Sequence, residues 1–360
     1  MSALLASFAK PLTLRSRDGH EPGRKVTWLE LFFDLVFVAA VSQVATPLGH
    51  DYSFAAFGRL VLLFVLIWWA WHGHTTYATR FDSDDVIQRV LTLLQMFAVI
   101  VMAINSRDAL DSRDAAGFAA AYAAMRLLLV AQYLRARRLP ESRPLTTAYA
   151  IGFGAAAGLW LASAAAPTPA RFWLWATALA VDFGTPLVTA RHLARIPPDS
   201  EHLPERFGLF TIILIGEAMI GVMHGMESQA TWTPEAAATA FLSMTSVFAI
   251  WWCYFDGSGA TSERHLRARE DVRRFHVWTY AHLPLYVGVL VFGVGLHHVI
   301  TVAGVSQLHG EEIALLASAL ALTIAAMATI ARASRRAAVH LIRRNVNVPN
   351  GATLPPDATG

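Results

Sequence analysis

The chain has 360 residues, of which 55% are hydrophobic and only 15% charged. Soluble domains contain about 25% charged residues, so this composition excludes an ordinary soluble protein and indicates a membrane protein. The formal net charge of +3 is modest and gives no reason to expect nucleic-acid binding. The single cysteine, Cys253, excludes a disulfide framework and any metal site built from several cysteines.

Ten apolar segments are long enough to cross a bilayer, which takes about 20 helical residues. We therefore expect an all-α fold, a polytopic transmembrane helix bundle of about ten spans. The expected spans are 28–47, 58–78, 89–105, 115–134, 145–165, 171–190, 207–225, 236–255, 277–300 and 311–331.

The distribution of basic residues predicts the orientation of these spans. Most of the 29 Lys and Arg residues fall before the first span, in every second loop after it and in the C-terminal tail. Basic loops stay on the cytoplasmic side, so both termini are expected there. This divides the chain into a cytoplasmic segment 1–27, a transmembrane domain 28–331 and a cytoplasmic, largely disordered tail 332–360.

Two pairs of similar stretches indicate an internal repeat. Ile67-Trp-Trp-Ala-Trp-His-Gly in the second span resembles Ile250-Trp-Trp-Cys-Tyr-Phe-Asp-Gly in the eighth, and Glu30-Leu-Phe resembles Glu205-Arg-Phe. An offset of six spans predicts a parallel repeat that relates spans one to three with spans seven to nine. The plainer interpretation is that Trp pairs are common in membrane helices.

The first span carries two acids, Glu30 and Asp34, near its start. Residues four apart lie on one face of a helix. A charge in hydrocarbon costs about 2.5–3.5 kcal/mol on insertion scales, so this face is expected to contact protein, water or an ion rather than lipid.

Other polar residues are predicted near the same cytoplasmic level. We expect them to converge on one shared acidic cavity, in which Arg80 and Arg206 are the counter-charges of Glu30 and Asp34. Glu217 is expected deeper, because eleven residues beyond Arg206 correspond to about 16 Å of helix. A carboxyl group near the midplane has no interfacial role, which makes Glu217 the leading candidate for ion or proton exchange. The other candidates are Arg80, Asp82, Asp85, Glu205, Arg206, Asp256 and His282.

Each candidate also has a structural interpretation. The carboxylates of Asp82 and Asp85 can cap the third span. Glu205 and Arg206 can act as a helix cap and an interfacial anchor. Glu30 and Asp34 can form an ion pair, with Arg80 or Arg206, that fastens the first span to the bundle.

The sequence predicts no metal site and no cofactor. His72 and His74 are two residues apart, so their side chains diverge around a helix. The chain contains neither a phosphate-binding loop nor a dinucleotide-binding fingerprint.

Four motifs in order resemble one known family. They are Trp28-Leu-Glu-Leu-Phe-Phe-Asp34-Leu-Val-Phe, Tyr77-x-x-Arg-Phe-Asp82-x-Asp-Asp85, His202-x-x-Glu-Arg-Phe-Gly-Leu-Phe-Thr-Ile-Ile-x-x-Gly-Glu217 and Trp251-Trp-x-Tyr-Phe-Asp256. Over about residues 25–330 the chain resembles the bacterial low temperature requirement A (LtrA) proteins. The resemblance implies a multi-pass protein of the bacterial inner membrane with a link to growth in the cold, and it names no reaction.

These observations favour a secondary transporter or a proton or cation pathway, with Glu217 as the exchanging group and Glu30 and Asp34 at the mouth. An enzyme is less expected. The alternatives are a membrane-embedded enzyme that acts on lipid or a lipophilic cofactor, and a structural or sensory membrane protein. The expected partners are the lipid bilayer and protons, cations or a small solute, without nucleic acid, and the sequence leaves a homo-oligomer open.

Overall fold

The computed structural model describes most of the chain. For residues 82, 191, 193, 269, 270 and 335–346 it describes the backbone alone. The described residues are 12–14, 26–82, 85–107, 109–110, 115–193, 195–199, 201–229, 231–257 and 269–346.

The fold is a bundle of long helices, as predicted, with one short strand pairing. Strand β1 (Thr13–Leu14) pairs antiparallel with β2 (Phe81–Asp82) and so joins the N-terminal segment to the loop after α3. Short helical turns are η1 (Pro140–Ser142), α8 (Ala190–Leu193) and the π-helical turn η2 (Cys253–Gly257). The long helices are α2 (Trp28–His50), α3 (Phe54–Ala78), α4 (Val86–Ile104), α5 (Ala115–Ala136), α6 (Arg143–Ala165), α7 (Ala170–Val188), α9 (His202–Glu227), α10 (Pro234–Trp252), α11 (Arg269–Val302) and α12 (Gly310–Val346).

Several helices begin at residues that cap them. The side chains of Thr27, Ser53, Asp85 and Thr233 each accept a hydrogen bond from the backbone N–H three residues further along, at the starts of α2, α3, α4 and α10. Such residues satisfy backbone donors that have no partner inside the helix.

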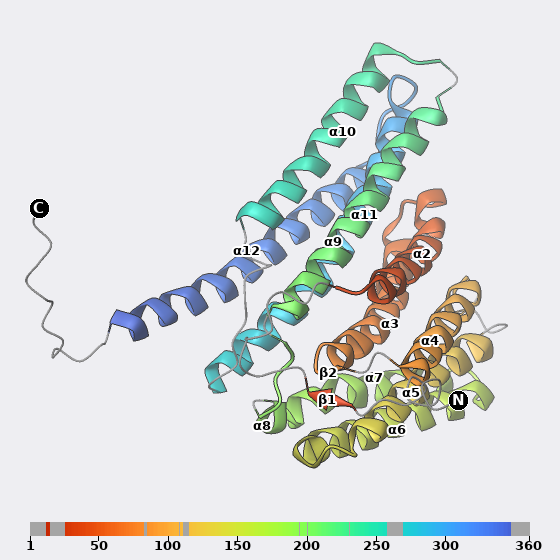
Figure 1. The fold of residues 1–360 in the computed structure, drawn as a ribbon. Coiled ribbons are helices and arrows are strands. Elements are labelled where there is room, and N and C mark those ends of the chain that lie inside the picture. Colours follow the sequence, from red (N-terminus) through yellow and green to blue (C-terminus); the bar gives the residue numbers. More distant parts are fainter. Residues whose placement is uncertain are drawn as a thin grey trace, which may run out of the picture.

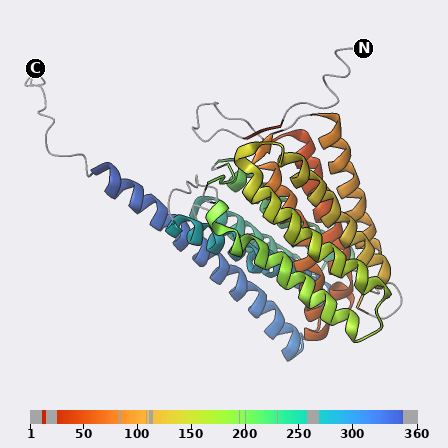
Figure 2. The ribbon, with the colours of Figure 1, turned by 90° about the horizontal axis from the view of Figure 1, so that it is seen from below.

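The helices form two groups with α2 and α3 between them (Figure 1). On one side, α4, α5, α6 and α7 pack in sequence order; on the other, α9 packs on α10 and α11, and α11 packs on α12. Helix α2 contacts α4 in the first group and α9 and α11 in the second. Seen from below, α4–α7 form one layer, and the last turns of α12 extend beyond the bundle (Figure 2).

Helix α3 is the most enclosed of the described helices along its second half. From Leu66 to Ala78 every side chain is buried, including Trp68, Trp69 and Trp71. A helix that is apolar on all sides packs in the centre of a bundle. Polar residues on this part of α3 therefore lie inside protein rather than in lipid.

Nine helices in the described part of the chain are long and apolar enough to cross a membrane, and they match nine of the ten expected spans. The remaining segment, expected at 171–190, is the helix α7, whose hydropathy is lowered by Arg171 and Asp182. Helix α12 continues to Val346 through a stretch rich in Ala and Arg, residues with high helix propensity. The expected disordered tail is thus helical up to that residue, and its remainder lies outside the described residues.

The internal repeat remains a prediction. Its two Trp-Trp stretches lie in different environments, because Trp68 and Trp69 are buried in the bundle whereas Trp252 is 56% exposed.

Candidate functional site

A buried ion pair joins α2 to α9 inside the bundle. The guanidinium of Arg206 donates to both carboxylate oxygens of Asp34, over 3.0 Å from Nε to Oδ2 and 2.5 Å from Nη2 to Oδ1. The Trp71 indole N–H donates to the same carboxylate over 2.7 Å. Asp34 and Arg206 are fully buried. Because water does not reach these buried side chains, the bidentate pair and the additional Trp71 donor compensate their charges instead.

Glu30 extends this cluster by one helical turn. Its carboxylate accepts hydrogen bonds from the backbone N–H and the hydroxyl of Thr27, completing a capping box at the start of α2. It also lies 3.2 Å from Nε2 of His202 and 3.4 Å from Nη1 of Arg206. We name the set Glu30, Asp34, His202 and Arg206 the closed cluster. Of the two structural alternatives for these acids, pairing with Arg206 is confirmed, and the interfacial-anchor interpretation of Arg206 is wrong, because its side chain is fully buried.

Helices α2 and α9 run parallel beyond this cluster and meet again at Glu217. The hydroxyl of Ser42 on α2 donates to the Glu217 carboxylate over 2.5 Å. The three contacts Glu30–His202, Asp34–Arg206 and Ser42–Glu217 join residues with nearly constant sequence separation, 172, 172 and 175. Only two helices that run in the same direction give such a series.

Glu217 is half-buried and lines an open pocket of about 360 Å³ between α2, α9 and α11. We name this cavity the Glu217 pocket. Its polar lining residues besides Glu217 are two hydroxyl residues and three histidines, namely Ser42, Thr46, His50, His224 and His297.

No described Arg or Lys forms an ion pair with Glu217, in contrast to Asp34. The described residues also contain no group of three or more His, Cys, Asp or Glu side chains arranged to hold a metal ion. The pocket therefore combines one carboxylate with imidazole and hydroxyl groups, all of which can accept or donate protons.

Small residues set the wall of this pocket. A Cβ atom added to Gly221 on α9 would lie 2.9 Å from the carbonyl oxygen of Gly293 on α11, and one added to Gly293 would lie 2.7 Å from Cβ of Ala218. Close helix approach through small residues is typical of membrane bundles. It brings the backbones of α9 and α11 together beside Glu217.

Three of the other predicted candidates, Arg80, Asp82 and Asp85, lie after α3. Asp85 caps α4, accepting from the backbone N–H of Gln88 over 2.9 Å, and its carboxylate forms an ion pair with Arg135 of α5. Its capping role is thus confirmed. The side chain of Asp82 lies outside the described ones. Arg80 is not the counter-charge of Glu30 and Asp34 that we expected, because Arg206 fills that place.

Three candidates lie outside the Glu217 pocket; Glu205 borders the closed cluster through His202, and Asp256 and His282 belong to neither site. Glu205 is partly exposed and lies 3.6 Å from Nδ1 of His202. Asp256 is exposed in the π-helical turn η2. His282 is buried in α11, and its Nε2 lies 3.0 Å from the hydroxyl of Tyr254. The expectation of one shared cavity is therefore not what the described residues show.

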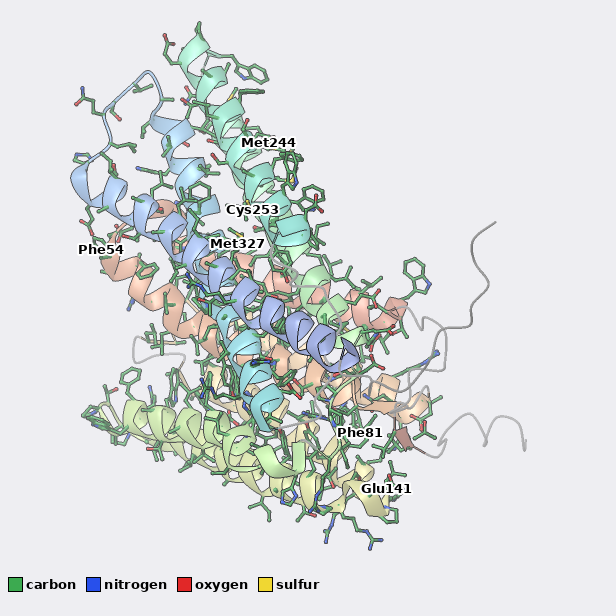
Figure 3. All side chains as sticks on the ribbon, turned by 90° about the vertical axis from the view of Figure 1, so that its left-hand side faces the viewer. Phe54, Phe81, Glu141, Met244, Cys253 and Met327 are labelled. Carbon is green, nitrogen blue, oxygen red and sulfur yellow. The ribbon has the colours of Figure 1, made fainter. Side chains whose placement is uncertain are left out.

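The reason is distance along the helices. Ser42 follows Glu30 by twelve residues, or about 18 Å of helix, and so it meets Glu217 toward the other ends of α2 and α9. Figure 3 gives the orientation: Phe54 and Phe81 mark the two ends of α3, which packs antiparallel to α2. The closed cluster belongs to the Phe81 end and the Glu217 pocket extends toward the Phe54 end.

Sequence reasoning missed one buried polar cluster. Nε of Arg126 on α5 donates to Asp182 on α7 over 3.0 Å, and the Tyr122 hydroxyl donates to the same carboxylate over 3.1 Å. Both charged side chains are fully buried. The signal was available, because an Arg and an Asp inside two expected spans require a partner within the bundle. The pocket histidines carried no comparable signal, since each lies on a different helix.

Comparison with known proteins identifies the family. Residues 25–348 match the family model described as bacterial low temperature requirement A protein (LtrA). A protein of Rhizobium meliloti (strain 1021), itself described as uncharacterized, is 31% identical over 304 residues, which are 80% of this chain and 73% of the relative. No solved structure matches the chain. The chain therefore belongs to the bacterial low temperature requirement A family, and it is a multi-pass membrane protein.

Proposed function

We propose that this protein moves protons or cations across the membrane through the Glu217 pocket. The observation that carries the proposal is the environment of Glu217: a half-buried carboxylate in a membrane-spanning helix, lining a pocket of about 360 Å³ and lacking an ion pair with any described Arg or Lys. Ionisable residues within transmembrane segments are costly, and they are retained mainly on ion and proton pathways.

Three other buried acids differ from Glu217 in having an arginine partner, and this difference supports the proposed role of Glu217. Asp34, Asp85 and Asp182 are each matched by one arginine, namely Arg206, Arg135 and Arg126. A carboxylate that accepts hydrogen bonds from an arginine has its negative charge matched within the protein and offers fewer lone pairs to an exchanging ion. Among the described residues, the Ser42 hydroxyl is the one hydrogen-bond donor to Glu217, which leaves carboxylate lone pairs for a proton or a cation.

The histidines extend the chemistry of the carboxylate. His50 lies at the end of α2 and His224 in the last turn of α9, about 10 Å along the helix from Glu217. Imidazole is the side chain that exchanges protons most readily near neutral pH. A series of carboxylate, hydroxyl and imidazole groups is the composition that a proton path requires, so we give protons priority over larger cations.

The test is flux into liposomes that contain the purified full-length chain and a pH-sensitive dye. Under an imposed pH gradient we expect the wild-type protein to acidify the lumen faster than protein-free liposomes, and Glu217→Gln to reduce that rate at least tenfold. Glu235→Gln, which changes an exposed acid in the first turn of α10, is the matched control and should keep the wild-type rate. Proton and cation flux equal to that of protein-free liposomes, together with normal growth of a Glu217→Gln strain in the cold, would contradict the proposal.

A structural role is the second candidate, and the one-to-one matching of Asp34, Asp85 and Asp182 with arginines favours it for those residues. In that case replacing a complete pair by apolar residues is tolerated. An enzyme acting on lipid has no comparable support among the described residues. A lipid chain bound between helices and reaching Glu217 would be the observation in its favour.

A further inference from the structure

A second, smaller cavity lies on the other side of α3, near its C-terminal end. Its volume is about 20 Å³, and its walls come from α3, α5, α6, α7 and α11. No described residue that lines it is Asp or Glu. The polar side chains that line it and that matter here are Arg80, His72, Thr76, Tyr133, His276 and Thr279.

Arg80 is buried, with 2% of its surface exposed, yet it forms no ion pair with a described carboxylate. Its Nη1 donates to the carbonyl oxygen of Thr76 over 3.4 Å, and its guanidinium carbon lies 5.7 Å from the centre of the Tyr149 ring. Its Nε–H has no hydrogen-bond partner. The two other fully buried arginines, Arg126 and Arg206, are each paired with an aspartate.

A buried cation without a counter-charge is expensive. The described protein atoms around Arg80 supply a carbonyl group and an aromatic face, which are weak substitutes for an anion. The missing negative charge is therefore expected from a bound ion rather than from the described side chains around this guanidinium.

The neighbouring polar atoms point to the same conclusion. Four more buried polar atoms of lining residues have no hydrogen-bond partner: Nε1 of Trp69, the Tyr133 hydroxyl, Nε2 of His276 and the Thr279 hydroxyl. Each can act as a hydrogen-bond donor, given the suitable tautomer of His276. Buried polar groups normally have partners, so five such groups without one around a single small cavity indicate a missing acceptor.

The volume limits what that acceptor is. About 20 Å³ holds one water-sized particle and excludes phosphate, sulfate and carboxylate-bearing ligands. A water molecule satisfies hydrogen bonds and leaves the charge of Arg80 uncompensated. We propose that the Arg80 cavity binds a monatomic anion of the size of chloride, held by the Arg80 guanidinium and the hydroxyl groups of Tyr133 and Thr279. This site is separate from the Glu217 pocket and does not rest on the proposed function.

The proposal is tested by halide-dependent stability of the purified full-length protein in detergent. At constant pH and ionic strength, gluconate is replaced stepwise by chloride or bromide, and the midpoint of thermal unfolding is followed. An ion that binds only the folded state raises this midpoint with its concentration. We expect chloride and bromide to raise it by several degrees along a saturable curve and sulfate to have no such effect.

Variants assign the effect to the cavity. Arg80→Gln should abolish the halide response, and Tyr133→Phe should weaken the apparent chloride affinity about tenfold through the loss of one hydrogen bond to a charged group. Arg137→Gln, which changes an exposed arginine just beyond α5, is the matched control and should keep the wild-type response. If Arg80→Gln does not fold, Tyr133→Phe and Thr279→Val decide the question.

Broadening of the ³⁵Cl resonance by the protein, reversed by bromide and lost in Tyr133→Phe, supplies a direct measure of binding. A wild-type midpoint that is the same in chloride and gluconate overturns the proposal and leaves water in the cavity. A halide response that Arg80→Gln and Tyr133→Phe share with the wild-type protein also overturns it.

Discussion

The acids at the two ends of the α2–α9 contact, Asp34 and Glu217, differ in their hydrogen-bond partners. At the closed cluster, Asp34 receives two hydrogen bonds from Arg206 and one from Trp71. In the Glu217 pocket, the carboxylate receives one hydrogen bond from Ser42 and faces open space. The same pair of parallel helices thus contains one acid paired with a buried arginine and one acid that no described Arg or Lys pairs. Burial alone does not separate these two acids, and the presence or absence of an arginine partner does.

The largest expected effect separates these two acids by stability. Asp34→Ala leaves Arg206 buried without its partner, which should lower the free energy of unfolding by about 3–5 kcal/mol. Glu217→Gln keeps an acceptor for Ser42 and should cost less than about 1 kcal/mol. Thermal and denaturant unfolding in detergent measures both. Equal losses in the two variants would remove the distinction between the sites.

The close approach of α9 and α11 provides the next test, because it sets the wall of the Glu217 pocket. Gly293→Val places atoms against Ala218 and should cost about 1–3 kcal/mol by overpacking. Gly154 of α6 has no atom within 4 Å of its added Cβ, so Gly154→Ala is the control and should be neutral or slightly stabilising. We expect Gly293→Val also to reduce proton flux, measured in liposomes. Unchanged stability would mean that the two backbones separate without penalty.

Asp85 is a third kind of acid, a helix cap with an arginine partner, and it sharpens the comparison. Asp85→Ala removes the hydrogen bond to the Gln88 backbone and should cost about 1–2 kcal/mol. Asp85→Asn retains a capping oxygen, so the difference between the two variants isolates the cap from the ion pair with Arg135. Proton flux should be the same in both. A loss of flux in Asp85→Asn would assign this residue to the pathway.

The smallest expected effect concerns Ser42. Ser42→Ala removes the donor to Glu217 and should change stability by about 0.5–1.5 kcal/mol, with a severalfold decrease in proton flux rather than its loss. Ser246→Ala on α10, whose hydroxyl bonds only to its own helix, is the matched control. Flux equal to wild type in Ser42→Ala would show that Glu217 works without this hydrogen bond.

The helical bundle could be predicted from the sequence because bilayer thickness and backbone hydrogen bonding impose long apolar helices. The boundaries were least accurate where charges are buried. Helix α9 begins at His202, whereas hydropathy placed the start at 207, since hydropathy counts Glu205 and Arg206 as polar and does not register that Asp34 neutralises Arg206. The extension of α12 was missed for the same reason, since hydropathy follows polarity and the helix follows propensity.

The candidate site was predictable only in part. Glu217 was found because a carboxyl group far inside an apolar helix is unusual in itself. The choice of Arg206 over Arg80 as partner of Asp34 depends on how α3 and α9 pack, which sequence spacing does not contain. The pairing of Arg126 with Asp182 was in principle accessible, since each is a charge inside an expected span that must find a partner.

The ion pair between Asp34 and Arg206 also has a mechanical consequence. It joins α2 to α9 at one level, whereas toward His50 the two helices line the Glu217 pocket. If α2 tilts relative to α9, the ion pair is therefore the point about which it rotates. Over the sixteen residues from Asp34 to His50, about 24 Å of helix, a tilt of about 5° displaces the far end by about 2 Å. Such a tilt would change the width of the Glu217 pocket and leave the ion pair between Asp34 and Arg206 intact.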